Sequence, residues 1–430
     1  MYNRSIKRGY TARPTPAALC PQTTKNTPTK VGGVTRKEKS AMKTDLSQDI
    51  RYVGVDDLRI DLFEGQYLVP DGMSYNSYVI LDEKVAVMDT VDARFGEEWL
   101  ANLDRALEGR IPDYLVIQHM EPDHSANLLR FADAYPAAVI VATDKAFRMM
   151  GQFFGRDFAD RRLVVGEGDC LPLGRHTLSF VLAPMVHWPE VMVSYETSEK
   201  LLFSADAFGR FGVPDAAVDW ATEARRYYIG IVGKYGVQVQ ALLKKAAALD
   251  IRTICPLHGP CLSGDDLAKA WQLYDLWSSY TPEAEGVVIA YASIYGHTAE
   301  AAKRLADRLR ADGCHAVVLY DLARCDKAAA VADAFRYDRL VLASVTYNAD
   351  LFPPMRSFLS ALVERGFKRR RVAFIECGTW APQAAKCMRA AFEKSPDLTF
   401  CENTVKIFSA LNAANEAQIA ALSAELCHKD

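Results

Sequence analysis

The chain has 430 residues, half of them hydrophobic, which is enough for two or three domains with full-sized cores. Charged residues interrupt every hydrophobic stretch before it nears the roughly 18 apolar residues that a membrane span requires, so we expect a soluble protein with no membrane partner. Residues 1–41 carry nine Lys or Arg and one Glu, which leaves 42 basic and 53 acidic residues downstream. This acidic body argues against nucleic acid binding, because phosphate recognition needs a clustered basic surface.

The basic N-terminal segment is rich in Thr, Pro and Lys and has no hydrophobic periodicity. We therefore expect residues 1–44 to form a disordered extension. Two other interpretations stay open. Met42 is a natural start, so the preceding stretch could reflect a mis-assigned start codon, and its Arg-bearing, acid-poor composition is also compatible with an organelle transit peptide. The segment has no resemblance to a secretory signal.

The cysteines are scattered, and no two of them form a CxxC pair. This spacing excludes the usual zinc-ribbon, rubredoxin and thioredoxin motifs. In a chain of this size we interpret them as buried thiols in a reducing compartment, which favours a cytoplasmic location. The ten positions are Cys20, Cys170, Cys255, Cys261, Cys314, Cys325, Cys377, Cys387, Cys401 and Cys427.

Residues 45–280 alternate short β-rich runs with helical stretches and predict a mixed α/β domain. The β-rich runs are SYVILDE, KVAVMDT, DYLVIQ, AVIVAT, TLSFVLA and KLLFSAD. A helical segment near Asp265–Tyr280 precedes the polar stretch 281–286, which we interpret as a linker.

Residues 287–430 follow a more regular pattern. Short apolar strands such as VVIAYA, RLVLAS and RVAFIE alternate with amphipathic helices such as AAKRLADRL. This pattern is typical of a parallel sheet that is covered by helices on both faces.

A dense group of ionisable residues follows the apolar run DYLVIQ. His119-Met-Glu121-Pro-Asp123-His124 offers four potential metal ligands within six positions. Three further candidates end other apolar runs, at His187, Asp206 and His258. Strand ends converge on one edge of a layered α/β fold, so these side chains can meet at one site.

Each of the last three residues is, taken singly, equally compatible with a cap, a turn or a core histidine. The HxExDH cluster is harder to explain in that way, because burying so many ionisable groups is costly unless a positive charge compensates them.

The order HxExDH…H…D…H resembles the metallo-β-lactamase superfamily, in which HxHxDH followed by His, Asp and His holds two metal ions. Glu121 stands where the zinc hydrolases of that superfamily have their second histidine, and this exchange is the mark of the flavodiiron proteins. A carboxylate adds negative charge and a hard oxygen donor, which suits iron. The stretches FEGQY, SYNSYVILDEKVAVMDTV, HWPEVM and DAFGRFG also resemble flavodiiron sequence.

The resemblance implies a metallo-β-lactamase-like αββα sandwich that holds two iron ions. One iron would take His119, Glu121 and His187, the other Asp123, His124 and His258, and Asp206 would bridge them. In the family that the sequence resembles, the residue equivalent to His124 does not always reach the metal. Trp188 would line the substrate pocket, although a core tryptophan is an equally good interpretation.

The second half carries three loops that are similar to those of flavodoxins. Ser293-Ile294-Tyr295-Gly296-His297-Thr298 matches the phosphate loop S/T-x-Y/T-G-N/H-T, in which hydroxyls and backbone N–H groups at a helix start bind the FMN phosphate. The next two strand ends supply the loops that flank the flavin ring, with Tyr347 and Trp380 as stacking candidates. Those loops are Ser344-Val345-Thr346-Tyr347-Asn348 and Cys377-Gly378-Thr379-Trp380.

The resemblance covers residues 45–430 and implies an oxidoreductase. In such proteins electrons pass from FMN to the two irons, where O2 is reduced to water, NO to N2O, or both. It also implies a head-to-tail homodimer or a dimer of dimers. We expect a separate electron donor, such as a rubredoxin, a reduced flavin or deazaflavin, or a reductase. The alternatives are a dizinc hydrolase with an accessory flavodoxin domain and a non-enzymatic electron carrier with a vestigial metal site.

Overall fold

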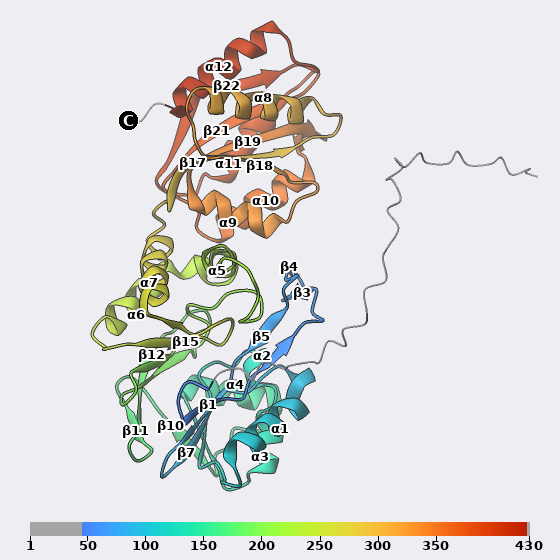
Figure 1. Ribbon diagram of the computed structural model, residues 1–430. Coiled ribbons are helices and arrows are strands. Elements are labelled where there is room, and N and C mark those ends of the chain that lie inside the picture. Colours follow the sequence, from blue (N-terminus) through green and yellow to red (C-terminus); the bar gives the residue numbers. More distant parts are fainter. Residues whose placement is uncertain (1–44, 428–430) are drawn as a thin grey trace, which may run out of the picture. The chain divides into compact units, whose positions relative to one another are not determined.

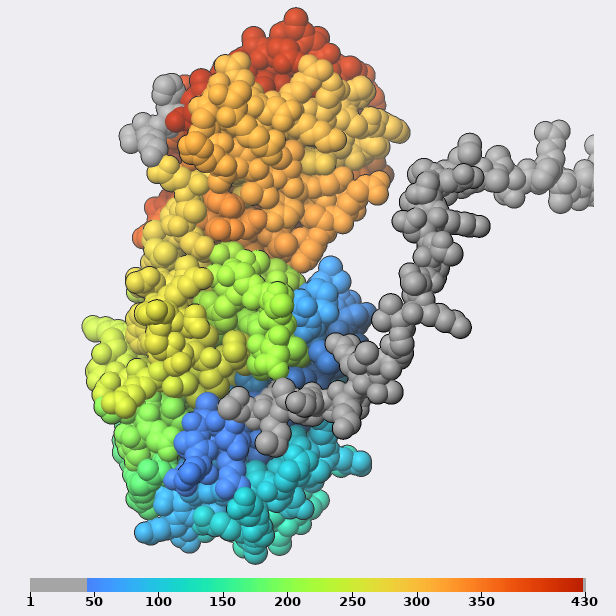
Figure 2. Space-filling view, viewed as in Figure 1, coloured from blue at the N-terminus to red at the C-terminus, as the bar shows by residue number. Residues whose placement is uncertain are grey.

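The computed structural model describes residues 45–427, and the expectations for residues 1–44 lie outside that range. The described residues form three large sheets and twelve α-helices (Figure 1). Each β-rich run named above contains a strand, and the predicted change to regular strand–helix alternation is confirmed. Figure 2 shows one face of the molecule as a space-filling view in the same orientation and colours.

Two six-stranded sheets build the first half of the chain. The first sheet has the spatial order β1 (Ile50–Tyr52), β6 (Tyr78–Leu81), β7 (Val85–Met88), β8 (Tyr114–Val116), β9 (Val139–Ala142) and β10 (Arg162–Val164). The second has the order β11 (Cys170–Pro172), β12 (Thr177–Leu182), β13 (Met192–Glu196), β14 (Leu201–Phe203), β15 (Thr253–Cys255) and β16 (Leu262–Ser263). Two small ribbons pair β2 (Val55–Asp57) with β5 (Met73–Tyr75) and β3 (Leu62–Phe63) with β4 (Tyr67–Leu68).

The two sheets pack face to face. Ile80 and Met88 of the first sheet share a buried cluster with Phe180 and Phe203 of the second. Helices cover both outer faces, so the layers follow the αββα order that the resemblance implies. The helices of this half are α1 (Gly96–Leu107), α2 (Pro122–Ser125), α3 (Leu128–Ala134), α4 (Asp144–Phe154), α5 (Trp220–Tyr227), α6 (Gly236–Ala246) and α7 (Gly264–Ser278), with short turns η1 (Ala93–Phe95), η2 (Tyr228–Val232) and η3 (Gly233–Tyr235).

Local sequence signals account for the ends of these helices. The side chain of Thr143 caps α4 by accepting a hydrogen bond from the N–H of Ala146 at 3.2 Å. Gly155 ends the same helix with a φ of 65°, a conformation that glycine adopts without strain.

The second half contains the third large sheet. Its parallel strands have the order β18 (Val317–Asp321), β17 (Ala284–Ala292), β19 (Tyr337–Tyr347), β21 (Arg370–Cys377) and β22 (Leu398–Ile407), and the short β20 (Asp350–Leu351) pairs with β19. This order, in which the first strand lies between the second and the third, is that of a flavodoxin-like doubly wound sheet.

Helices cover both faces of the third sheet, as the alternating pattern predicts. α8 (His297–Ala311) and α12 (Ala413–Cys427) pack against one face. α9 (Lys327–Arg336), α10 (Pro353–Glu364) and α11 (Ala384–Ala391) contribute buried side chains to a different core cluster.

The expected linker is shorter than predicted. Residues 281–286 were expected to be linker, but β17 begins at Ala284, so only residues 279–283 separate it from α7. Contacts of Glu283 explain why the strand begins inside the predicted linker. Its carboxylate binds Arg225 at 2.6 and 2.7 Å and the indole N–H of Trp277 at 3.0 Å. The polar composition of residues 281–286 predicted a linker because it does not show that Glu283 is fixed by side-chain contacts.

Within residues 45–427, none of the helices combines the length and the apolar character that crossing a bilayer demands.

Candidate functional site

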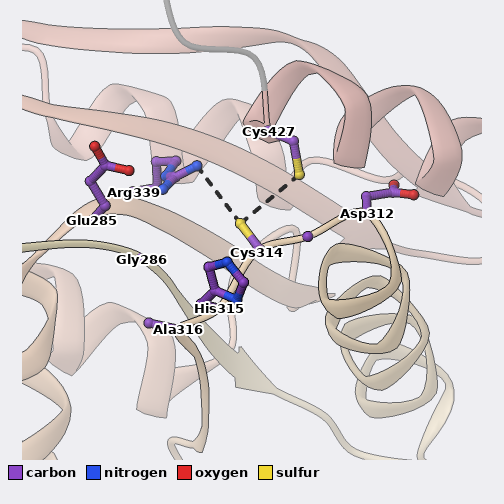
Figure 3. A pocket seen from close by; sticks show the side chains of 9 residues that line it. Glu285, Gly286, Asp312, Cys314, His315, Ala316, Arg339 and Cys427 are labelled. Carbon is purple, nitrogen blue, oxygen red and sulfur yellow. Dashed lines mark hydrogen bonds between the residues drawn. The ribbon is translucent and has the colours of Figure 1, made fainter.

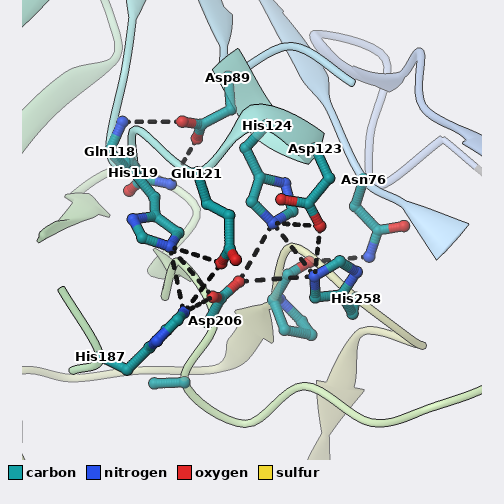
Figure 4. Close-up of polar contacts among 12 residues, drawn as sticks. Asn76, Asp89, Gln118, His119, Glu121, Asp123, His124, His187, Asp206 and His258 are labelled. Carbon is teal, nitrogen blue, oxygen red and sulfur yellow. Dashed lines mark hydrogen bonds and ion pairs between the residues drawn. The ribbon is translucent and has the colours of Figure 1, made fainter. Parts of the chain in front are cut away.

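The predicted ligands come from the ends of strands in both sheets of the sandwich. His119 follows β8, and Glu121 precedes α2, which carries Asp123 and His124 on a single turn. His187 lies between β12 and β13, Asp206 follows β14, and His258 follows β15. All seven side chains meet at one place (Figure 4). The prediction that these strand ends converge is therefore confirmed.

The side chains form two groups. The first contains His119, Glu121, His187 and Asp206, and its ligand atoms all lie within 4.8 Å of one another. The second, equally tight, contains Asp123, His124 and His258.

Asp206 faces both groups with different oxygens. Its Oδ2 lies 3.3 Å from Nε2 of His119 and 3.1 Å from Nε2 of His187. Its Oδ1 lies 3.3 Å from Nε2 of His124 and 3.7 Å from Nε2 of His258. This is the position that a carboxylate bridging two metal ions would take.

His124 lies within the second group. Its Nε2 lies 3.1 Å from Nε2 of His258 and 3.4 Å from Oδ2 of Asp123. Its Nδ1 is buried without a hydrogen bond, as are both oxygens of Asp123. Unpartnered buried carboxylate oxygens are costly, and a cation held by Asp123 and by Nε2 of His124 and His258 would satisfy the oxygens of Asp123.

The imidazole orientations also fit metal binding. Nδ1 of His119 donates to the carboxylate of Glu190 at 2.8 Å, and Nδ1 of His258 donates to the carbonyl of Ser74 at 2.7 Å. When Nδ1 carries the proton, Nε2 of each ring can offer its lone pair to a metal ion in the site. Nε2 of His119 and Nε2 of His187 lie 3.3 Å apart, so one cation could contact both.

The pKa values reflect the crowding of carboxylates and imidazoles. Burial by itself raises the pKa of Glu121, but contacts with His119 and His187 lower it to about 2. Burial by itself lowers the pKa of His187, but contacts with Asp206 and Glu121 raise it to about 9. In the metal-free site, protons on histidine therefore supply the positive charge that the carboxylates need, and a metal ion would replace them.

Sequence reasoning missed two buried carboxylates that support the ligands. Glu190, with a fully buried side chain, binds His119 and accepts the N–H of Met120 at 2.9 Å. Asp89 is also buried and accepts two hydrogen bonds from Gln118, the residue before His119. A signal for Glu190 was present in the stretch HWPEVM, where one acidic residue stands beside the apolar start of β13.

Aromatic rings surround the two groups. Trp188 stands edge-on to His119 with ring centroids 5.3 Å apart, and it also packs against the hydrophobic core. Phe63, Tyr75 and Tyr227 place their rings 5.3 to 5.8 Å from that of His258. Glu121, with 17% of its side chain exposed, marks the most open side of the groups.

The three predicted flavin loops lie at one edge of the third sheet. The register pairs Ala292 of β17 with Ser344 of β19, and Ser344 with Glu376 of β21. The chain therefore leaves three adjacent parallel strands at the same level. Gly296 is the N-cap of α8 and has no side chain to cap it, which leaves the first N–H groups of the helix available for an anion.

The predicted flavin residues differ in what they present. Tyr347 and Trp380 are exposed, at 42% and 90%, so both side chains are accessible for stacking on a flavin ring. Ser344 is buried and its hydroxyl donates to the carbonyl of Val345. The hydroxyl of Thr346 accepts the N–H of Gln383 and so holds the start of α11. These two hydroxyls have partners within the protein.

Comparisons with known proteins agree with both halves. A family described as "ODP family beta lactamase" matches residues 73–259, and one described as "Flavodoxin domain" matches residues 288–409.

Relatives cover most of the chain. The rubredoxin-oxygen oxidoreductase of Megalodesulfovibrio gigas is 31% identical over 323 residues, which are 72% of this chain and 79% of the relative. The nitric oxide reductase of Moorella thermoacetica is 30% identical over 329 residues, 74% of this chain and 81% of the relative. The structure of the flavodiiron protein from Giardia intestinalis matches with a TM-score of 0.77 and 25% identity, covering 89% of this chain and 96% of that one. The chain belongs to the flavodiiron family.

Proposed function

We propose that this protein is a flavodiiron oxidoreductase, which passes electrons from FMN to a pair of iron ions and there reduces O2 to water, NO to N2O, or both. The observation that carries the proposal is the position of Asp206, which faces two groups of ligands with separate oxygens. The relatives named above as oxygen and nitric oxide reductases support both substrates.

The metal assignment follows the two groups. His119, Glu121 and His187 would hold one iron, and Asp123, His124 and His258 the other, with Asp206 shared between them. Reduced FMN supplies two electrons and a ferrous pair two more, which matches the four that O2 requires and exceeds the two that join two NO molecules.

The protein's own groups prepare this site. Glu190 fixes the orientation and the tautomer of His119, so that Nε2 stays directed at the metal. The aromatic rings around His258 exclude water from the second group, which strengthens the electrostatic interactions inside it. Trp188 lies beside His119 and would limit the size of the ligand that reaches the irons.

We assign the FMN phosphate to Ser293–Thr298, where Gly296 has a φ of 95° and the start of α8 is uncapped. Tyr347 and Trp380 would contact the flavin ring. The other two loops would bind through their backbone, since the hydroxyls of Ser344 and Thr346 already have partners.

Partner proteins complete the proposal. A separate donor, such as a rubredoxin or a flavin reductase, would reduce the FMN. Exposed aromatic residues in and beside the flavin loops, among them Tyr295 and Phe408, support a head-to-tail dimer in which a second copy covers this edge of the sheet.

Anaerobic turnover tests the function. Protein produced with iron and riboflavin available is reduced with a viologen dye and then given O2 or NO in separate runs, with water and N2O as the expected products. Glu121→Ala should lose both activities while keeping its FMN. A dizinc hydrolase is the competing function. It would be supported by two zinc ions per chain together with hydrolysis of an ester or lactam, and that result would overturn the proposal.

A further inference from the structure

Two cysteines from separate elements lie close together near the starts of the strands of the third sheet, whereas the flavin loops follow the ends of those strands. Cys314 lies in the turn between α8 and β18, and Cys427 is the last residue of α12. Their Sγ atoms are 3.9 Å apart although 113 positions separate them in the chain (Figure 3). Both thiols are free and partly exposed.

Arg339 of β19 holds this arrangement together. Its guanidinium Nη1 donates to the carbonyl of Leu426 at 2.7 Å, which fixes the end of α12. The same nitrogen lies 3.8 Å from Sγ of Cys314, as Figure 3 shows. The thiolate is the form that reacts. Burial raises the pKa of the Cys314 thiol, and the guanidinium of Arg339 only partly offsets this effect.

A small molecule can reach the pair. The two cysteines line a cavity of about 140 Å³, together with Asp312, His315 and Arg339. A disulfide needs an S–S distance of about 2.05 Å, so the two sulfur atoms must approach by roughly 1.9 Å. Rotation of side chains at a turn and at a helix end allows this approach more readily than rotation inside a packed core.

We propose that Cys314 and Cys427 are a redox modification site, where a small-molecule disulfide oxidises the two thiols to a reversible intramolecular disulfide. One protein thiolate attacks the small disulfide, forms a mixed disulfide and releases one small thiolate. The second protein thiolate then attacks the mixed disulfide at the protein sulfur and releases the other small thiolate. The protein loses two electrons, which reduce the small disulfide, and its two thiol protons pass to the released thiols.

The bond ties the end of α12 to the α8–β18 turn. α8 and α12 cover the same face of the third sheet, so the bond closes a loop around most of the second half of the chain. Closing a long loop restricts the unfolded chain and stabilises the folded one. The flavin loops lie at the carboxyl ends of the strands, whereas Gly286 and Arg339 of this cavity lie near their starts. FMN content should therefore not change.

The test uses the full chain with its FMN. Protein reduced by a thiol reagent and then freed of it is incubated anaerobically with oxidised glutathione, remaining thiols are alkylated, and an unreduced digest is analysed by mass spectrometry. We expect a peptide that joins Cys314 to Cys427, and a higher urea midpoint for the loss of flavin-domain structure that a thiol reagent reverses. Cys427→Ser and Cys314→Ser should each lose both effects, whereas Cys170→Ser, a change at an exposed cysteine outside the pair, should keep them.

Two outcomes would overturn the proposal. In one, Cys314 and Cys427 are recovered as separate glutathione adducts or alkylated thiols without a joined peptide. In the other, oxidation raises the urea midpoint of Cys427→Ser as much as that of the unaltered protein.

Discussion

Replacing Glu190 should weaken iron binding although this residue is not itself a proposed ligand. One oxygen of its buried carboxylate accepts both the Nδ1–H of His119 at 2.8 Å and the N–H of Met120 at 2.9 Å. Burial by itself raises the pKa of Glu190, but His119 lowers it, so the group is charged at neutral pH. A negatively charged carboxylate that accepts the Nδ1–H makes Nε2 of the same ring a stronger ligand for a metal ion.

The magnitude follows from these contacts. Glu190→Gln keeps an oxygen that can accept both hydrogen bonds but removes the charge, so we expect about a tenfold loss of iron affinity, equal to about 1.4 kcal/mol. Glu190→Ala also leaves two buried donors unpaired, and the loss should approach a hundredfold or about 2.8 kcal/mol. The measurement is the iron retained per chain against a graded series of a chelator.

The chain offers a matched control in Glu196. Its buried carboxylate binds Nδ1 of His176 at 3.0 Å, and the guanidinium of Arg175 bonds Nε2 of that histidine at 2.8 Å. A protein cation thus lies beside His176 where, beside His119, the proposed iron would lie. Glu196→Gln should lower stability and leave iron affinity unchanged.

The reasoning would be refuted if Glu190→Gln retained iron as well as the unaltered protein. It would fail equally if Glu196→Gln lost as much iron as Glu190→Gln, because the effect would then be one of general stability.

Other predictions concern protons, flavin and assembly. Because contacts with Asp206 and Glu121 raise the pKa of metal-free His187 to about 9 against the effect of burial, protons compete with the metal below that pH, and iron retained against a chelator should decrease as the pH falls from about 9 to about 6. Unchanged retention over that range would contradict the assignment of His187. Gly296→Trp should abolish FMN binding, seen as loss of visible absorbance with an unchanged circular dichroism spectrum, because the glycine has a φ of 95° at the start of α8. Mixing this variant with inactive His119→Ala under conditions that exchange subunits should restore activity if flavin and irons from different chains face each other; confirmed exchange without activity would rule out the head-to-tail dimer.

Local sequence determined the elements and most of the candidate site. Apolar runs of four to eight residues predict the strands, and the ionisable residues that end those runs, from His119 to His258, match the ligand pattern of the family that the sequence resembles. The flavin loops were predicted from their similarity to flavodoxin loops, and their places after three strands agree with that similarity. Strands and short motifs depend on residues that are close together in the chain, so they can be predicted from a single sequence.

Tertiary structure alone decided which distant groups meet. Glu190 lies 71 positions from His119 and Cys427 lies 113 positions from Cys314, and no periodicity relates the members of either pair. Asp206 presents one oxygen to each group of ligands because the turn that follows β14 brings it within reach of both His119 and His124. The early start of β17 depends likewise on Glu283 reaching Arg225. Contacts of this kind arise from sheet register and layer packing, in which each position depends on many others at once.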